Sequence, residues 1–362
     1  MNQRVPAIDV LRGLVMIIMA LDHTREFFHV GAMSFSPEDL RKTTPELFFT
    51  RWITHFCAPV FVFTAGLGAW FWKRDGRTAA DQTRYLLGRG LWLMLAELTL
   101  FRFAAFFTAP GPVLLTVLWA IGLSMVVLAG LIHLPLRLVA GLSLATIALH
   151  NLADGIRLTG AWQMLHQLGA FQVAGLTVVS VYPLVPWFAV MAAGYCLGPL
   201  VQQRERIERW GWALTIGFVL LRLANLYGDP VPWDGSVLSF FRTTKYPPSL
   251  AFLLMTLGPA LVVMSRLGRI SFAAANPLLV FGRTPLFYFL VHFLLLHLLT
   301  FPLGWLRYGR IDFLWAPAPS MGGAAAAYPS GYGYDLPAVY AIWIFVVIAM
   351  YPLCRWYANR KA

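Results

Sequence analysis

The chain has 362 residues, of which 59% are hydrophobic and only 12% are charged. Soluble domains carry about 25% charged residues, so this composition excludes an ordinary soluble protein. The formal net charge of +12 is spread over short segments between apolar stretches. Because it is not gathered in one soluble patch, we expect no nucleic-acid partner. The composition predicts an integral membrane protein with a single domain over residues 1–362.

Apolar windows of about 20 residues identify membrane-spanning helices. The sequence contains ten such windows, at residues 8–29, 47–72, 87–107, 112–132, 135–151, 176–199, 210–226, 248–266, 277–301 and 337–357. With the N-terminus placed in the cytoplasm, the cytoplasmic segments hold about twice as many Lys and Arg residues as the opposite side, as the positive-inside rule requires. We therefore expect an all-α polytopic protein with about ten spans, both termini in the cytoplasm and the lipid bilayer as its partner.

Two ionisable residues of the first window, Arg12 and His23, lie eleven positions apart. At about 100° per residue they share one helical face, and the rise of 1.5 Å per residue separates them by about 16 Å. Ionisable groups at that depth face a cavity or a partner. A neutral imidazole accepts a proton near pH 7, so His23 is a candidate catalytic base. A structural or proton-pathway histidine is the alternative.

The acidic residues of the same window predict ion pairs. Asp22 precedes His23, but adjacent helical residues point about 100° apart. We therefore expect Asp22 to meet a basic group such as Arg25 or Arg51, and His23 to find its partner on another helix. Asp9 lies three residues before Arg12, which predicts an Asp–Arg pair at the helix end.

Polar residues in the later windows are further candidates, because ionisable groups inside a membrane are usually functional. Some have structural explanations: Glu97 and Arg102 as paired or interhelical charges, His297 as a packing histidine, and His150 with Asn151 at an interface. Arg222 and Asn225 either tie their helix to a neighbour or line a pocket. The three cysteines, Cys57, Cys196 and Cys354, lack metal-ligand spacing, so we expect buried free thiols and no metal site.

Several segments resemble one family of membrane enzymes. Ala7-Ile-Asp-Val-Leu-Arg-Gly-Leu resembles the opening of the heparan-alpha-glucosaminide N-acetyltransferase catalytic-domain family and its bacterial members. The segments that begin at Thr54 (THFCAPVFVF), Tyr182 (YPLVPWFAVMAAGY), Thr244 (TKYPPSL), Phe281 (FGRTPLFY) and Tyr351 (YPLCRW) look like the same bacterial group. The spacing from Arg12 to His23 also resembles the Arg-ten-residues-His motif of acyltransferase-three membrane enzymes. These segments extend over nearly the whole chain.

The resemblance implies a transmembrane acyltransferase-like bundle in the bacterial inner membrane. Such an enzyme moves an acyl group, acetyl first among them, from cytoplasmic acyl-CoA to a hydroxyl or amine acceptor, such as a sugar or envelope glycan, on the outer side. Acyl-CoA is then a co-substrate, and no cofactor is held permanently. The resemblance makes His23 the catalytic histidine, but His29 looks most like the active-site histidine of the animal enzyme, so the two compete.

The remaining site residues follow from this reading. Asp22 accompanies the catalytic histidines, and Arg12, Arg84 and Arg89 are candidate contacts for coenzyme A. Candidate acceptor-site residues are His55, Arg222, Asn225, Lys245, Tyr246, Arg283 and His292. A transporter or channel for a small solute is the alternative, since polar residues also line transport paths. The acyl group, the acceptor, an acyl-histidine intermediate and the oligomeric state, a homodimer included, stay open.

Overall fold

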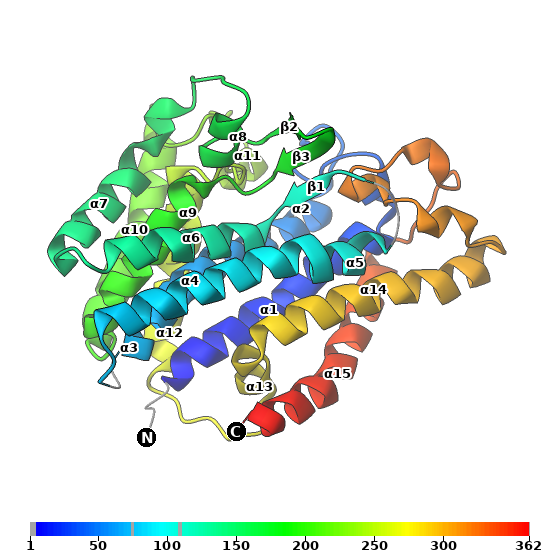
Figure 1. The fold of residues 1–362 in the computed structure, drawn as a ribbon. Coiled ribbons are helices and arrows are strands. Elements are labelled where there is room, and N and C mark those ends of the chain that lie inside the picture. Colours follow the sequence, from blue (N-terminus) through cyan, green and yellow to red (C-terminus); the bar gives the residue numbers. More distant parts are fainter. Residues whose placement is uncertain (1–4, 74–75, 108–110, 362) are drawn as a thin grey trace. The chain divides into compact units, whose positions relative to one another are not determined.

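The computed structural model describes residues 5–73, 76–107 and 111–361, and most of them are helical (Figure 1). The chain forms two compact units, each built from separate stretches of sequence. Unit 1 comprises residues 1–7, 58–99 and 112–270, and unit 2 comprises residues 8–57, 100–111 and 271–362. The prediction of one domain over residues 1–362 stays a prediction.

Unit 2 contains the first helix and the C-terminal helices. Its helices are α1 (Pro6–Phe28), α2 (Pro45–Trp52), α5 (Arg102–Phe106), α13 (Pro277–Arg283), α14 (Pro285–Tyr308) and α15 (Leu336–Lys361). α14 contacts α5 and α15, and α15 also contacts α13. Gly13 of α1 lies against the backbone of Leu278, and Gly282 of α13 lies against the backbone of Asp9. A Cβ atom at either glycine would collide with that backbone, so the close approach of α1 and α13 depends on both.

The predicted window 277–301 is two helices rather than one. Thr284, between α13 and α14, has φ −124° and ψ 40°, and Pro285 follows it at the start of α14. A proline disfavours helical geometry in the preceding residue, and it is well tolerated in the first turn of a new helix. The break therefore falls where the sequence places a proline after Thr284.

Unit 1 is a set of paired helices. They are α3 (Cys57–Lys73), whose first residue belongs to unit 2, α4 (Ala79–Ala96), α6 (Val117–Leu131), α7 (Leu136–Leu149), α8 (Ala161–Leu165), α9 (Leu184–Leu197), α10 (Arg204–Ala224), α11 (Val237–Phe241) and α12 (Leu250–Leu267). α4 packs along α6, α10 packs along α12, and α9 contacts both α6 and α7 (Figure 1). A capping box between Thr78 and Asp81 fixes the start of α4.

A small sheet in unit 1 corrects the all-α prediction. β3 (Leu176–Ser180) pairs in parallel with β1 (Val113–Leu115) and antiparallel with β2 (Gly169–Val173). Ala174 and Gly175 both have positive φ, as a two-residue hairpin turn requires. The sequence assigned residues 113–115 and 176–180 to spanning helices. A short apolar run such as Leu-Thr-Val-Val cannot be distinguished from a buried helix by periodicity alone.

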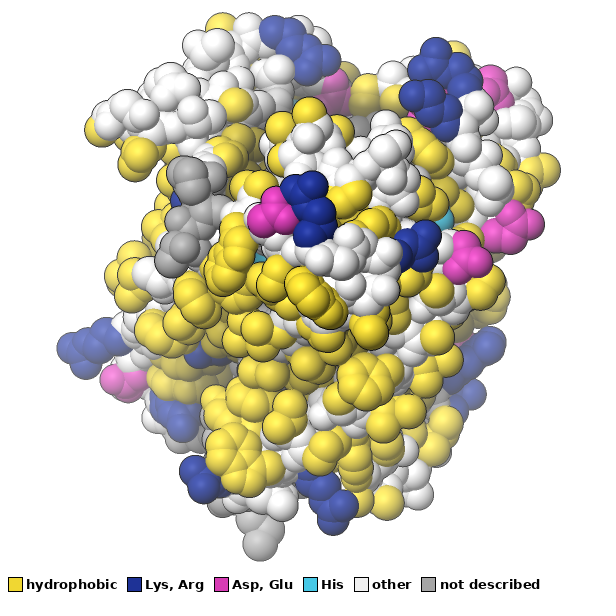
Figure 2. Space-filling model, turned by 90° about the vertical axis from the view of Figure 1, so that its right-hand side faces the viewer, with side chains coloured by type: hydrophobic (Ala, Val, Ile, Leu, Met, Phe, Trp, Pro, Cys, Tyr) yellow, Lys and Arg dark blue, Asp and Glu magenta, His cyan; other side chains and the backbone are white. Residues whose placement is uncertain are grey.

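The described residues include five helical segments long and apolar enough to cross a membrane, at residues 45–73, 136–153, 250–267, 285–308 and 336–360. Two shorter apolar helices, Val117–Leu131 and Leu184–Leu200, add to them. α14 and α15 expose large hydrophobic side chains such as Trp305 and Phe345. Figure 2 shows a broad field of hydrophobic side chains on the face in view, with most charged groups above and below it. These features support a helical membrane protein, but the count of ten spans and the orientation stay predictions.

Candidate active site

A pair of histidines links α1 to α14 within unit 2. His23 Nδ1 lies 2.8 Å from His292 Nε2, and His292 Nδ1 lies 2.7 Å from the carbonyl oxygen of Tyr288, one turn earlier on α14. A carbonyl oxygen only accepts, so His292 donates from Nδ1 and, when neutral, accepts at Nε2. His23 must then donate from Nδ1. The lone pair of neutral His23 is therefore on Nε2, which is the position of a general base.

The surroundings of this histidine pair are aromatic. His292 is fully buried and His23 is half-buried. The ring of Phe293 meets the His23 ring edge-on at a centroid distance of 4.9 Å, and Phe289 lies 6.1 Å away. A weakly polar environment strengthens a hydrogen bond and so holds the pair in register. The prediction that the partner of His23 comes from another helix is confirmed.

Next to His23, a charge cluster joins the end of α1 to α2 and the segment before it. We define it as Asp22, Arg25, Glu38, Arg51 and His55. Asp22 Oδ1 accepts from Arg25 at 3.1 Å, and Asp22 Oδ2 accepts from Arg51. Glu38 Oε1 accepts from Arg51 Nε at 3.3 Å and lies 2.9 Å from His55 Nε2. The prediction that Asp22 meets Arg25 or Arg51 is confirmed, and both pairs form.

The charge cluster is mostly buried, which explains its connectivity. Removing one partner of a buried ion pair leaves an uncompensated charge and typically costs about 3–5 kcal/mol. Two guanidinium groups hold Asp22 as an acceptor, so its geometry fits a positioning role. Glu38 was not identified as a site residue from the sequence, because it lies between two apolar windows in a segment without a recognisable motif. Its only signal was an acidic residue near the predicted outer end of α1.

His29 occupies a different chemical position from His23. It follows α1 directly, is buried, and its Nδ1 accepts from the backbone N–H of Gly31 at 3.0 Å. When neutral, His29 therefore carries its proton on Nε2. Its acceptor nitrogen is already used to cap the turn Val30–Met33. The two competing histidines are distinguished by which ring nitrogen holds the lone pair and what that nitrogen contacts.

At the other end of α1, two arginines meet one aspartate. Arg12 Nη1 lies 3.3 Å from Asp9 Oδ1, which confirms the predicted pair, and Arg283 Nε lies 3.9 Å from Asp9 Oδ2. These three side chains together carry one net positive charge. Guanidinium groups in such a setting suit bidentate contacts with phosphate or carboxylate. We call Asp9, Arg12 and Arg283 the arginine pair with its aspartate.

The other candidate residues lie in unit 1. Arg84 is exposed on α4, 3.8 Å from Asp81, and Arg89 lies on the same helix. Lys245 is buried, with its Nζ 5.2 Å from the centre of the Tyr246 ring, and Tyr246 meets Tyr182 edge-on. His23, His292, Asp22 and His55 all belong to unit 2, whereas Arg84, Arg89, Lys245 and Tyr246 belong to unit 1.

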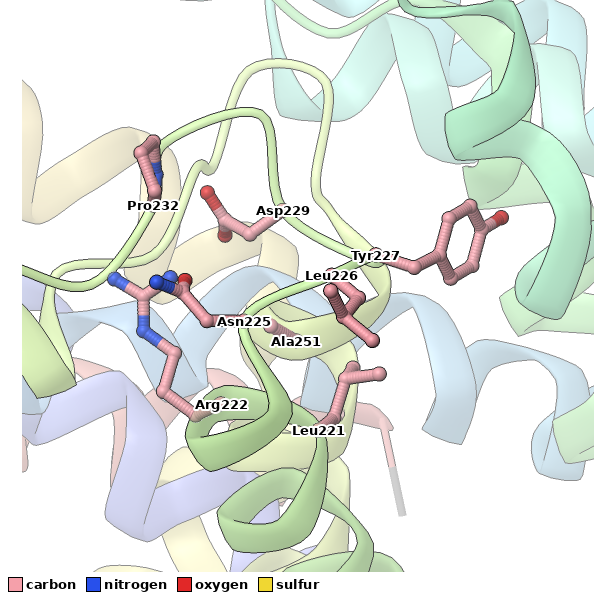
Figure 3. Close-up of a pocket in the computed structure, with 8 residues that line it drawn as sticks. All are labelled: Leu221, Arg222, Asn225, Leu226, Tyr227, Asp229, Pro232 and Ala251. Atoms are coloured by element: carbon pink, nitrogen blue, oxygen red, sulfur yellow. The ribbon is translucent and has the colours of Figure 1, made fainter.

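Arg222 and Asn225 support a loop and line a pocket (Figure 3). Arg222 donates to the backbone carbonyls of residues 231, 239, 240 and 242 at 2.7–3.1 Å. Asn225 exchanges two hydrogen bonds with the backbone of Trp233. Asp229, in the same pocket, accepts from Thr244 and Ser249. Arg222 and Asn225 thus tie α10 to the segment that follows it, and both also line the pocket.

Glu97 and His297 make structural contacts, with Glu97 acting as a helix cap, while Arg102 donates to the carbonyl of Gly111 at 3.2 Å. Glu97 caps the start of α6, since its carboxylate accepts from the backbone of Thr116 at 3.0 Å and of Leu118 at 3.2 Å. His297 Nδ1 donates to the carbonyl of Ala104 at 2.9 Å and stacks on Phe107. The three cysteines are free thiols, with Cys57 and Cys354 buried and Cys196 half-buried.

A comparison with protein families finds one match that bears on these residues. The family model described as "Heparan-alpha-glucosaminide N-acetyltransferase, catalytic" matches residues 4–230, which is more than half of the chain. The chain belongs to this family. Membership indicates a membrane protein with an acetyltransferase-type function. The match includes His23, His29 and the charge cluster, and it ends before α14 with His292. A comparison with curated proteins finds no match.

Proposed function

We propose that this family member transfers an acyl group, acetyl first among them, from cytoplasmic acyl-CoA to a hydroxyl or amine on the opposite side of the membrane. A sugar of an envelope glycan is the acceptor class, and the bacterial inner membrane is the location. The observation that carries the proposal is the hydrogen-bonded sequence from His23 through His292 to the carbonyl of Tyr288. It orients His23 with the lone pair on Nε2.

In the proposed reaction, His23 is the general base. The acceptor O–H or N–H gives its proton to His23 Nε2 while its oxygen or nitrogen attacks the thioester carbonyl. The new C–O or C–N bond forms, the carbonyl becomes an oxyanion, and the C–S bond then breaks. The departing CoA thiolate takes the proton back from His23. General-base assistance of this kind is typically worth about 10²–10⁴ in rate.

His292 gives the protonated state of His23 a partner. When Nε2 of His23 takes up the proton, Nδ1 continues to donate to His292 Nε2. The imidazolium therefore keeps a hydrogen bond that was already aligned before the reaction, and preorganised groups need no reorganisation as charge develops. The second chemical route is attack by Nε2 on the thioester carbonyl, which breaks the C–S bond, releases CoA thiolate and leaves an acyl-histidine. The acceptor oxygen or nitrogen then attacks that acyl group, the N–C bond to His23 breaks, and the acceptor proton passes to the CoA thiolate. Acyl-His23 in acid-quenched enzyme, detected by mass spectrometry, would favour that route.

We propose that the arginine pair with its aspartate, within unit 2, contacts the donor, and Arg84 and Arg89 of α4 in unit 1 stay separate predicted contacts for coenzyme A. Coenzyme A carries several phosphate charges, and Arg12 and Arg283 exceed the charge of Asp9 by one. Arg12 and His23 are separated by about 16 Å along α1. A pantetheine arm extending from phosphates near Arg12 would run parallel to the helix toward His23. Within unit 2, His55 stays a proposed acceptor contact and Asp22 a proposed positioning residue. Asn225, Lys245 and Tyr246 stay separate proposed acceptor contacts within unit 1.

Thioester turnover tests the proposed function directly. The purified protein in detergent is given acetyl-CoA with and without an extract of envelope glycans, and free CoA thiol is measured. We expect slow release alone and faster release with the extract, because an acceptor completes the transfer. The matched His23→Gln variant should release CoA about 10²–10⁴-fold more slowly than the wild type. A wild-type protein that releases none with any short-chain acyl-CoA would contradict the proposal and restore the transporter alternative, which family membership does not favour.

Donor binding provides a second prediction, which separates phosphate contacts from the rest of the ligand. Removing one charge-assisted hydrogen bond costs about 1.5–3 kcal/mol, so Arg12→Ala should weaken acetyl-CoA binding by about 10–100-fold. S-acetylpantetheine lacks the phosphates and should bind both proteins equally. Calorimetry at low salt measures both ligands, since exposed charge pairs are screened over about 8 Å at physiological salt.

Asp9→Asn is the matched control for donor binding. It keeps the shape of the site while removing the negative charge between the two arginines, so it should bind acetyl-CoA at least as tightly as the wild type. Equal losses for acetyl-CoA and S-acetylpantetheine in Arg12→Ala would show a general distortion. That result would remove Arg12 from the donor site.

A further inference from the structure

Two histidines and one aspartate that the proposed acyl transfer does not use converge in unit 1. His150 follows the end of α7, Asp154 comes one turn later, and His166 follows α8. One nitrogen or oxygen ligand atom from each residue lies within 4.8 Å of the others. His150 and His166 are only 6% and 5% exposed, and Asp154 is half-buried. Asp154 directly follows the candidate span at residues 136–153, and its side chain is 20% exposed.

The ring nitrogens of these histidines lack sufficient hydrogen-bond partners. Neither nitrogen of His150 has a hydrogen-bond partner, and neither does Nδ1 of His166. A buried polar group left unsatisfied costs about 1–3 kcal/mol. Native proteins rarely keep several such groups together unless something unseen satisfies them, such as an ion.

The surrounding contacts hold the side chains of Asp154 and His166 in place. Asn151 Nδ2 donates to Asp154 Oδ2 at 2.8 Å, and its Oδ1 accepts from the backbone of Leu250 at 2.8 Å. Asp154 Oδ1 then lies 3.7 Å from His166 Nε2. The same nitrogen lies 2.7 Å from the carbonyl oxygen of His150. Outer contacts of this kind orient metal ligands in proteins, where an amide or carbonyl fixes each ligand group.

We propose that His150, Asp154 and His166 form a binding site for a divalent transition-metal ion, with zinc the best match. Two imidazoles and one carboxylate are ligands that Zn²⁺ prefers, with bonds of about 2.0–2.2 Å. Ligand atoms in such a site are about 3.3 Å apart, so the three groups, whose ligand atoms now lie within 4.8 Å of one another, must move closer together around the ion. Zinc would then tie the end of α7 to the loop and helix that lead into β2.

The sequence prediction of no metal site considered the cysteines. Three residues separate His150 from Asp154, and eleven separate Asp154 from His166. This spacing matches no regular metal-binding motif. Only the fold of residues 150–166 places His166 beside His150. The proposal does not depend on the acyltransferase assignment, because it concerns metal content and stability rather than turnover.

Zinc content tests the site in the purified full-length protein. The protein is treated with chelator, incubated with Zn²⁺, and separated from free metal before elemental analysis. We expect about one zinc ion per chain in the wild type. Adding zinc should also raise the melting temperature, because a ligand that binds only the folded state stabilises it. Asp154→Asn keeps the side-chain shape and should weaken zinc binding by at least about 10–100-fold.

Two further variants keep the result interpretable. His166→Gln should also lose the zinc. His133→Gln changes an exposed histidine of the same unit that lies outside the site and should keep it. Zinc content and thermal shift that are equal in the wild type, Asp154→Asn and His166→Gln would overturn the proposal. A wild-type protein that retains no zinc would also overturn the proposal, whatever the variants do.

Discussion

His23→Gln is expected to lower kcat for acyl transfer by about 10²–10⁴, the usual contribution of a general base. Glutamine retains a side-chain N–H that can donate to His292, but it cannot accept a proton from the acceptor. Because His23 contacts no phosphate in the proposed mechanism, the KM for acetyl-CoA should stay within about twofold. A loss confined to kcat is the signature of an interaction used in the transition state. Steady-state CoA release with a saturating acceptor measures both constants.

His29→Asn is the matched control for this prediction. Asparagine can accept the hydrogen bond from Gly31 N–H that His29 now accepts, and it is a favourable residue at such a cap. We expect a nearly normal rate, because only the cap function is needed. An inactive His29→Asn with an active His23→Gln would transfer the catalytic role to the segment after α1. Normal rates in both variants would exclude base catalysis by either histidine.

The contacts of α1 show what helical periodicity can predict. A spacing of three residues predicted the pair Asp9–Arg12. The 100° step between neighbours predicted that Asp22 would turn away from His23 toward basic groups, and Arg25 and Arg51 are those groups. Both predictions succeeded because buried charges must be paired and a helix offers few directions in which to pair them. The candidate status of His23 followed from the same reasoning.

The identity of long-range partners could not be predicted in this way. His292 was a candidate, but nothing in its sequence context pairs it with a residue 269 positions earlier. Glu38 was missed because it lies outside the apolar windows, although it joins Arg51 to His55. The sheet was missed because a five-residue strand such as Leu176–Ser180 is as apolar as a helix. These features arise from packing between distant segments, which a single sequence does not specify.

A second large effect is expected at His292, a positioning residue. His292→Leu removes the acceptor of the His23 Nδ1 proton, so the tautomer of His23 is no longer fixed. We expect kcat to fall by about 10–100-fold, less than for loss of the base itself, while acetyl-CoA binding stays unchanged. His292→Gln offers an amide oxygen to the same proton, so it should recover a large part of the rate. Single-turnover rates and calorimetric donor binding measure the two effects separately.

His297→Leu separates positioning of His23 from packing of α14. His297 lies on the same helix, is buried, and donates one hydrogen bond to a backbone carbonyl, as His292 does. Both leucine variants therefore remove a buried imidazole and a similar hydrogen bond, and both should lower the melting temperature. Of the two, we expect only His292→Leu to lower kcat, because His292 contacts His23 through a ring nitrogen, whereas the Nδ1 of His297 donates to Ala104. Equal losses of kcat in the two variants, or no recovery in His292→Gln, would assign the effect to packing and remove His292 from the mechanism.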